Sequence, residues 1–116
     1  EGGSGAGSVG LGFAAPASGL PPGSKEQARV DRWVARGQQM LNAGEVAQAR
    51  LLLTRAAELG DARGALLLGT SYDPNALPWR PGMGPEAEPL RAKELYQLAI
   101  KLGAGDEAQK RLSDLP

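Results

Sequence analysis

Residues 92–103 read AKELYQLAIKLG, and residues 49–60 read ARLLLTRAAELG. Aligned without a gap, these segments are identical at five pairs: Ala49 and Ala92, Leu52 and Leu95, Ala56 and Ala99, Leu59 and Leu102, Gly60 and Gly103. The correspondence continues beyond the glycine with one extra residue, pairing Gly64 with Ala108 and Leu68 with Leu112. The sequence therefore contains two copies of one supersecondary unit.

The repeated alanines predict how these units pack. Apolar residues recur every three or four positions in both segments, which is the period of an amphipathic helix. Small side chains let neighbouring helices approach closely, while the large residues beside them fill the space between layers. A single unit leaves an apolar face uncovered, so units are expected to stack. We therefore expect Ala56 and Ala99 to be buried between helices.

Capping and stop signals divide the chain into five predicted helices. Ser24 and Gln27 have the capping-box spacing that starts a helix. Gly60 suits a left-handed helix stop, Asp61 suits an N-cap, and Pro89 suits the first position of a helix. The predicted helices span residues 25–42, 45–59, 61–72, 89–102 and 105–115.

The first and third predicted helices differ in the distribution of their apolar residues. Residues on one face of the first are Val30, Trp33, Val34, Gly37, Met40 and Leu41. Trp33 is therefore expected in the core. The third is apolar nearly all round at residues 65–68, so we expect it between two other helices. Tyr72 and Tyr96 occupy repeat positions and are expected to pack with hydrogen-bonded hydroxyls.

The composition excludes several classes of function. The chain has 116 residues, enough for one domain, and it contains neither cysteine nor histidine. The absence of these two residues excludes disulfides, thiolate or imidazole metal sites and the common nucleophile–histidine pairs. Thirteen basic residues balance thirteen acidic ones, so no overall field favours nucleic acid. No apolar run approaches the ~20 residues that span a bilayer. We expect no catalytic residue, no metal, no cofactor and no membrane insertion.

Two segments rich in glycine and proline interrupt the helical pattern. Residues 1–24 contain eight of the seventeen glycines and one charged residue, Glu1, so we expect a disordered, flexible tether. The helical domain follows at residues 25–116. Within it, residues 73–88 form a predicted loop that is longer than most connections in compact domains and is therefore a functional candidate. The chain is expected to be a piece of a longer protein.

The repeated segments resemble a known family. One segment carries the motif Ala92-x-x-Leu95-Tyr96-x-x-Ala99-Ile100-x-x-Gly103. Its counterpart at 49–60 is followed by Leu68-Gly69-x-x-Tyr72. Both are similar to the Sel-one-like repeat (SLR), a relative of the tetratricopeptide repeat (TPR). The resemblance covers residues 30–115. The chain departs from the family pattern because Leu52-Leu53 replaces an aromatic pair, Leu112 is not followed by glycine, and the loop after Tyr72 is longer.

The resemblance implies an all-α fold, a short α-solenoid of about five antiparallel helices. It also implies a protein- or peptide-binding scaffold or adaptor module of a larger bacterial protein, without enzymatic activity, in the periplasm or cell envelope rather than the cytoplasm. Two alternatives stay open. In the first, the domain is a self-assembling structural element of the envelope. In the second, it binds its own N-terminal tail through residues 9–16. A partner-binding module should be a monomer or associate only weakly.

Candidate partner-binding residues come from three places. The first predicted helix carries a basic stripe that includes Arg32 and Arg36, and the long loop carries tryptophan, arginine and methionine, which are enriched at interfaces. The third predicted helix adds two residues. The full set is Arg32, Arg36, Arg63, Leu67, Trp79, Arg80 and Met83. The alternative for Trp79 is that it folds back over an apolar flank.

Two further motifs have weaker support. Residues 5–10 match GxGxxG, but the strand, helix and acidic residue of a dinucleotide site are missing from their surroundings. Asp73, Glu86 and Glu88 frame the long loop without the ligand order of an EF-hand. We therefore predict neither a nucleotide nor a calcium site.

Overall fold

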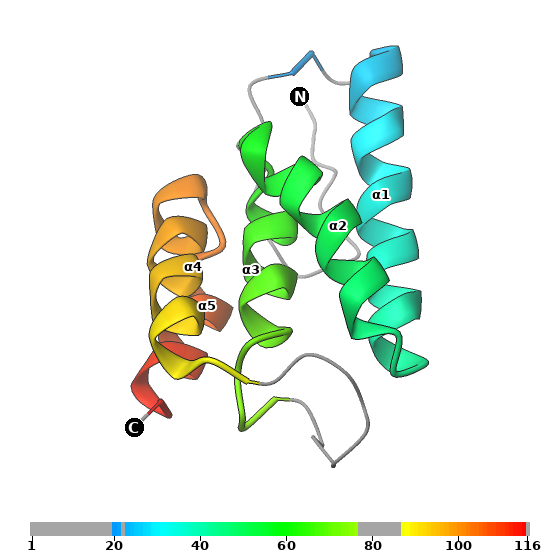
Figure 1. Ribbon diagram of the computed structural model, residues 1–116. Helices are drawn as coiled ribbons and strands as arrows, with labels where there is room; N and C mark the ends of the chain where they lie inside the picture. Colours follow the sequence, from blue (N-terminus) through cyan, green and yellow to red (C-terminus); the bar gives the residue numbers. More distant parts are fainter. Residues whose placement is uncertain (1–19, 22, 77–86, 116) are drawn as a thin grey trace.

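The computed structural model describes residues 20–21, 23–76 and 87–115, and in these ranges it contains five α-helices and no strand (Figure 1). The helices are α1 (Lys25–Asn42), α2 (Val46–Glu58), α3 (Ala62–Thr70), α4 (Pro89–Leu102) and α5 (Gly105–Ser113). The all-α prediction is confirmed for these residues. Most of the predicted tether and residues 77–86 of the predicted loop lie outside them, as do the candidates Trp79, Arg80 and Met83.

The N-caps of α1 and α3 are the predicted Ser24 and Asp61, but the reciprocal bond of a capping box is not formed at α1, where the Gln27 side-chain amide donates to Asp31 Oδ1 at 2.9 Å. The Ser24 hydroxyl accepts a hydrogen bond from the Gln27 N–H at 3.0 Å, and the Asp61 carboxylate accepts from the N–H groups of Arg63 and Gly64. The N–H of Ser24 itself donates to the Pro21 carbonyl at 3.1 Å. Side chain and backbone together therefore fix the start of α1.

Two predicted helix ends were too long by two residues, and the predicted end of α2 was too long by one. Helix α3 ends at Thr70 instead of residue 72, and α5 ends at Ser113 instead of residue 115. At the end of α3, the hydroxyls of Thr70 and Ser71 donate to carbonyls three residues earlier. The Tyr72 N–H also donates to a carbonyl three residues back, that of Gly69. This tighter spacing ends the α-helical pattern before the tyrosine.

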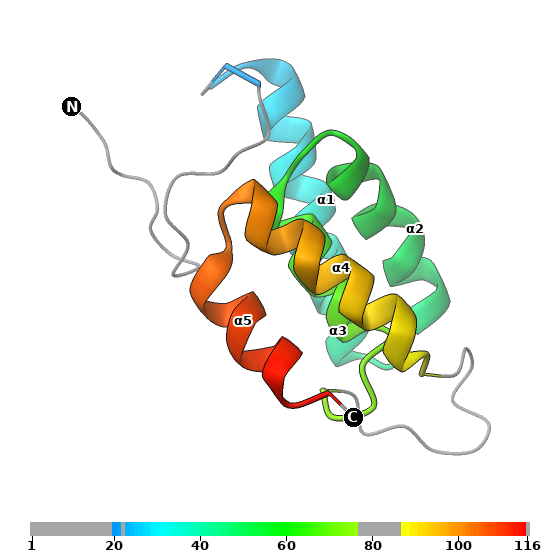
Figure 2. The same cartoon turned by 90° about the vertical axis from the view of Figure 1, so that its left-hand side faces the viewer.

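Each helix packs against the next one along the chain, and α1 also reaches α3. Helix α3 lies between α2 and α4, as its apolar sequence predicted (Figures 1 and 2). Its buried residues are Ala62, Gly64, Ala65, Leu66, Leu68, Gly69 and Thr70. The core consequently follows the order of the helices instead of surrounding a single centre.

The repeated alanines are buried, as predicted. Ala49 and Ala56 on α2 and Ala92 and Ala99 on α4 are each 0% exposed. Their helices approach neighbours so closely that a Cβ built on Gly64 would lie 2.7 Å from the Cβ of Ala56. Short side chains on both sides of a contact are what allow helix axes this close together.

A similar close contact involves each of the two similar segments, 49–60 and 92–103. A Cβ on Gly37 of α1 would lie 2.7 Å from the Leu53 side chain of α2, and a Cβ on Gly69 of α3 would lie 2.7 Å from the Tyr96 ring of α4. Leu53 and Tyr96 hold equivalent positions in segments 49–60 and 92–103. In each pair, a large side chain of the later helix therefore lies on a glycine of the earlier one.

Trp33 is a correction to the predicted core. Its side chain is half-buried, whereas Val30 and Val34 beside it are buried. Trp33 packs at the edge of the cluster that these valines form with Ala56. The helical period identified the correct face of α1, but that face is wider than the strip that α2 covers.

Replacing Gly69 with alanine tests the contact between α3 and α4. The added Cβ would meet the Tyr96 ring, and the ring is held by the hydrogen bond from its hydroxyl to Asp73 Oδ2 at 2.6 Å. We expect Gly69→Ala to lower the free energy of unfolding by about 1–3 kcal/mol in urea denaturation.

Gly105→Ala is the matched control, because a Cβ on this helical glycine meets nothing within 4 Å. We expect Gly105→Ala to leave stability unchanged or to raise it by up to about 1 kcal/mol through helix propensity. Equal stability of the two variants would contradict the close contact.

Candidate functional site

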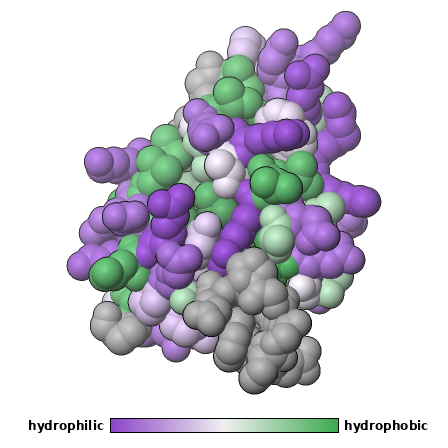
Figure 3. Space-filling model, in the orientation of Figure 1, coloured by the Kyte–Doolittle hydropathy of each residue, from purple (hydrophilic) through white to green (hydrophobic). Residues whose placement is uncertain are grey.

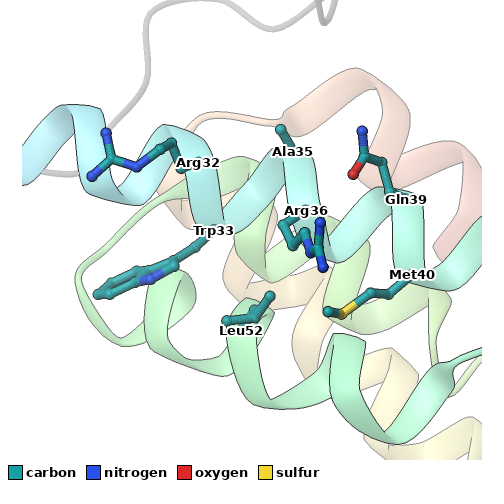
Figure 4. A pocket seen from close by; sticks show the side chains of 7 residues that line it. All are labelled: Arg32, Trp33, Ala35, Arg36, Gln39, Met40 and Leu52. Carbon is teal, nitrogen blue, oxygen red and sulfur yellow. The ribbon is translucent and has the colours of Figure 1, made fainter.

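A surface groove of about 570 Å³ lies between α1 and α2 (Figure 4). Its lining residues are Arg32, Trp33, Ala35, Arg36, Gln39, Met40 and Leu52. Two of the predicted partner-binding residues, Arg32 and Arg36, therefore lie at one site. Trp33, Met40 and Leu52 were not predicted there, although the helical spacing from Trp33 to Met40 placed both on one side of α1.

The floor of the groove is apolar and firmly supported. Figure 4 shows Trp33 and Met40 reaching from α1 toward α2, with Met40 directed toward Leu52. Trp33 packs on the cluster of Val30, Val34 and Ala56, and Met40 packs on the cluster of Ala49, Leu53 and Leu68. All three floor side chains are half-buried. Trp33 and Met40 therefore each have one side on the core and the other open to the groove.

Helix α3 supports the opposite side of the α1–α2 pair. Leu67 of α3, another predicted partner-binding residue, is half-buried and packs against both clusters that underlie the groove. Figure 4 shows α1 and α2 in front of the remaining helices, with the groove side chains facing the viewer. Leu67 therefore belongs to the support of the groove and not to its lining.

The rim of the groove is cationic. Arg32 and Arg36 are exposed, stand one helical turn apart, and form no ion pair with any other described residue. A third guanidinium, that of Arg55 on α2, lies 5.9 Å from the centre of the Trp33 ring, within the range of a cation–π interaction. The groove thus combines an apolar floor with positive charge.

Arg63, the remaining described candidate, makes intramolecular ion pairs. Its Nη2 lies 2.6 Å from Asp61 Oδ2 and 2.6 Å from Asp31 Oδ1, and its Nε donates to Asp61 Oδ1 at 3.0 Å. The hydrogen bond to Asp61 is the main reason that the pKa of Arg63 is raised, since partial burial opposes it and the bond to Asp31 adds to it. Arg63 connects α1 to the start of α3.

A second polar cluster holds the two ends of the predicted loop together. Arg50 of α2 lies 3.6 Å from the centre of the Tyr72 ring and donates from Nη2 to the Ser71 carbonyl at 2.6 Å. The pKa of Arg50 is lowered, chiefly because burial penalises its charge. Tyr72 accepts a hydrogen bond at its carbonyl from the Glu88 N–H at 2.7 Å. The chain therefore leaves and rejoins the helices at adjacent points.

Asp73, considered above as a calcium ligand, is almost fully buried and bound to neighbouring protein groups. Its carboxylate accepts from the Tyr96 hydroxyl at 2.6 Å and from the Asn75 N–H at 2.8 Å. Burial, followed by this hydrogen bond, raises the pKa of Tyr96, so the tyrosine stays a proton donor. Over the described ranges, no three acidic side chains are grouped as metal ligands would be.

None of the helices in the described ranges has the length and apolar character to cross a membrane. No protein-family model matches the chain, and neither a curated protein nor a solved structure matches it.

The contribution of Arg63 to stability can be measured with Arg63→Met. Asp61 is 0% exposed, and this substitution leaves its carboxylate buried without a cation. We expect the free energy of unfolding to fall by about 3 kcal/mol in urea denaturation, the cost of breaking a buried pair.

Glu107→Gln is the comparison, because it removes one charge from the ion pair with Arg111, whose side chains are 46% and 37% exposed. Exposed helix pairs of this kind contribute less than about 0.5 kcal/mol. If the two variants lost equal stability, Arg63 would not have the structural role described above.

Proposed function

We propose that this chain is a helical-repeat module of the Sel-one-like type, in which antiparallel helices stack as a short α-solenoid, and that it binds a protein or peptide partner. Two features support the solenoid arrangement. Each helix packs on its successor along the chain, and the contact of a large side chain on glycine recurs at equivalent repeat positions. Modules of this kind bury their core between neighbouring units and offer an extended surface for binding.

The groove between α1 and α2 is the observation that carries the binding proposal. Tryptophan and arginine are the residue types that contribute most at protein interfaces, and here Trp33, Arg32 and Arg36 line the same groove. Trp33 and Met40 are held from below by the core, so little ordering of these two side chains accompanies binding. Binding to a preorganised surface loses less conformational entropy than binding to a mobile one.

The chemistry of the chain favours a scaffold over an enzyme. Histidine and cysteine are absent from the sequence, and the buried carboxylates of Asp61 and Asp73 are occupied by intramolecular hydrogen bonds. The described residues that line the groove include no acidic side chain to act as a general base. By its resemblance, we assign the module to a larger bacterial protein, with the periplasm or envelope preferred over the cytoplasm.

Self-assembly is the second candidate function, and two exposed leucines favour it. Leu51 on α2 is 67% exposed and Leu90 on α4 is 79% exposed. On the side drawn in Figure 3, however, apolar groups are separated by hydrophilic ones. Stable interfaces between copies are usually larger and more continuous. The third alternative, binding of residues 9–16, concerns a segment outside the described residues.

A photo-crosslinking amino acid placed at Ala35 tests the binding proposal in cells that make the native protein. Ala35 lines the groove and is exposed, so a bound partner should form an adduct there. We expect a discrete adduct at Ala35, reduced at least tenfold by Trp33→Ala once circular dichroism confirms that this variant folds. Mass spectrometry identifies the adduct.

The control site is Gln109, which is exposed on α5 and distant in sequence from the groove. Equal adducts at Ala35 and Gln109 would contradict a binding site in the groove. Sedimentation over a range of concentrations separates the two candidate functions, because the binding module should remain a monomer and the assembly element should not.

A further inference from the structure

The cationic character of the α1–α2 groove is local. The whole chain is neutral, with thirteen basic and thirteen acidic residues. A second surface hollow, on α4, is lined by Glu94, Gln97, Leu98, Ile100 and Lys101, so it holds one charge of each sign. Among the residues that the structure describes, the lining of the α1–α2 groove holds two arginines and no acid. Of these two hollows, the α1–α2 groove is therefore the one whose described lining carries a net positive charge.

Acidic residues near the groove do not neutralise its rim. Glu26, Asp31, Glu45 and Glu58 are the acidic residues on α1, on α2 and at the α2 N-cap, and none of them lines the groove. Asp31, which precedes Arg32, accepts a hydrogen bond from Arg63 of α3 at 2.6 Å. The nearest negative charge in sequence is thus paired with a different cation.

The spacing of the rim charges indicates the form of a matching partner. Arg32 and Arg36 are four residues apart on one helix, a rise of about 6 Å. Like charges at this spacing disfavour an isolated helix, so their pairing is not explained by the stability of α1. Carboxylates four residues apart on a second helix have the same rise, and arginine can hold a carboxylate through two parallel hydrogen bonds.

The floor adds a second requirement. Trp33 and Met40 are seven residues apart, so the apolar strip they form with Leu52 runs along α1 for about 10 Å. An amphipathic helix offers an apolar stripe of that length beside its polar face. Helix-in-groove recognition uses this arrangement.

We infer that the α1–α2 groove binds an acidic amphipathic helix of a partner protein. The carboxylates of that helix pair with Arg32 and Arg36, and its apolar stripe packs on Trp33, Met40 and Leu52. This inference rests on the proposed binding function and specifies the partner's chemistry.

Selection from a displayed library of random sixteen-residue peptides, panned against the full 116-residue chain, tests the inference. Enriched peptides should carry an excess of aspartate and glutamate, with acids spaced by three or four residues beside leucine, isoleucine or phenylalanine. The affinity of a selected peptide, followed by fluorescence anisotropy, should fall at least tenfold when its acids are replaced by the corresponding amides. It should also fall as the salt concentration rises.

Two double variants locate the binding site. Arg32→Glu with Arg36→Glu should weaken binding of the selected peptide at least tenfold. Lys93→Glu with Lys101→Glu makes the same change in net charge on α4, where both lysines are exposed, and should change affinity less than twofold. Equal effects of the two double variants would show attraction by net charge alone and would overturn the inference.

The remaining outcomes separate this inference from the proposed function. Enrichment of neutral or basic peptides that lose affinity with Trp33→Ala would overturn the acidic partner and leave the binding function standing. Absence of any enriched peptide would count against both. Enrichment only after Leu11→Ser and Phe13→Ser would assign the groove to the chain's own N-terminal segment. If the chain forms a dimer that Arg32→Glu with Arg36→Glu abolishes, the groove would be assigned to a second copy of the chain. Binding of the N-terminal segment and dimer formation would each overturn the inference.

Discussion

Close approach of neighbouring helices at glycine and alanine is the constraint on which the rest of this structure depends. Leu53 lies on Gly37, the Ala56 methyl faces Gly64, and the Tyr96 ring lies on Gly69. At these contacts the positions of the backbones are set by side-chain volume, since there is no space for another carbon. Such packing makes the interior intolerant of small changes. It also fixes the relative positions of α1 and α2, and therefore the width of the groove between them.

Polar contacts add specificity to this packing. Arg63 joins Asp31 of α1 to the buried N-cap Asp61 of α3, and Tyr96 of α4 reaches Asp73 beyond the end of α3. The first contact connects α1 to α3 across the intervening α2, and the second connects α4 to the segment that follows α3. Because an unpaired buried carboxylate is costly, alternative helix arrangements that separate these partners are disfavoured. Apolar burial stabilises the stack, and these pairs select one arrangement of it.

Sequence patterns predicted the parts of the fold that depend on local chemistry. The cap at Ser24, the stop at Gly60 and the buried Ala56 and Ala99 follow from spacing along one segment, and each is confirmed. The predicted burial of Trp33 was wrong, because periodicity identifies the apolar face of a helix but not how much of that face a neighbouring helix covers. The pairing of Arg63 with Asp31 involves residues 32 positions apart, so no local pattern could indicate it.

The candidate site shows the same division. The basic stripe that includes Arg32 and Arg36 was visible in the sequence, whereas the apolar floor needed Leu52 of another helix beside Trp33 and Met40. The two parts are physically linked. Because Gly37 has no side chain, Leu53 of α2 packs directly on α1 at the centre of the α1–α2 interface. Trp33 and Met40 lie at the edge of that interface and are only half-buried. The contact of Leu53 with Gly37 thus buries the centre of the α1–α2 interface and leaves the apolar side chains of Trp33 and Met40 partly exposed at its edge. Arg32 and Arg36 line the groove beside them.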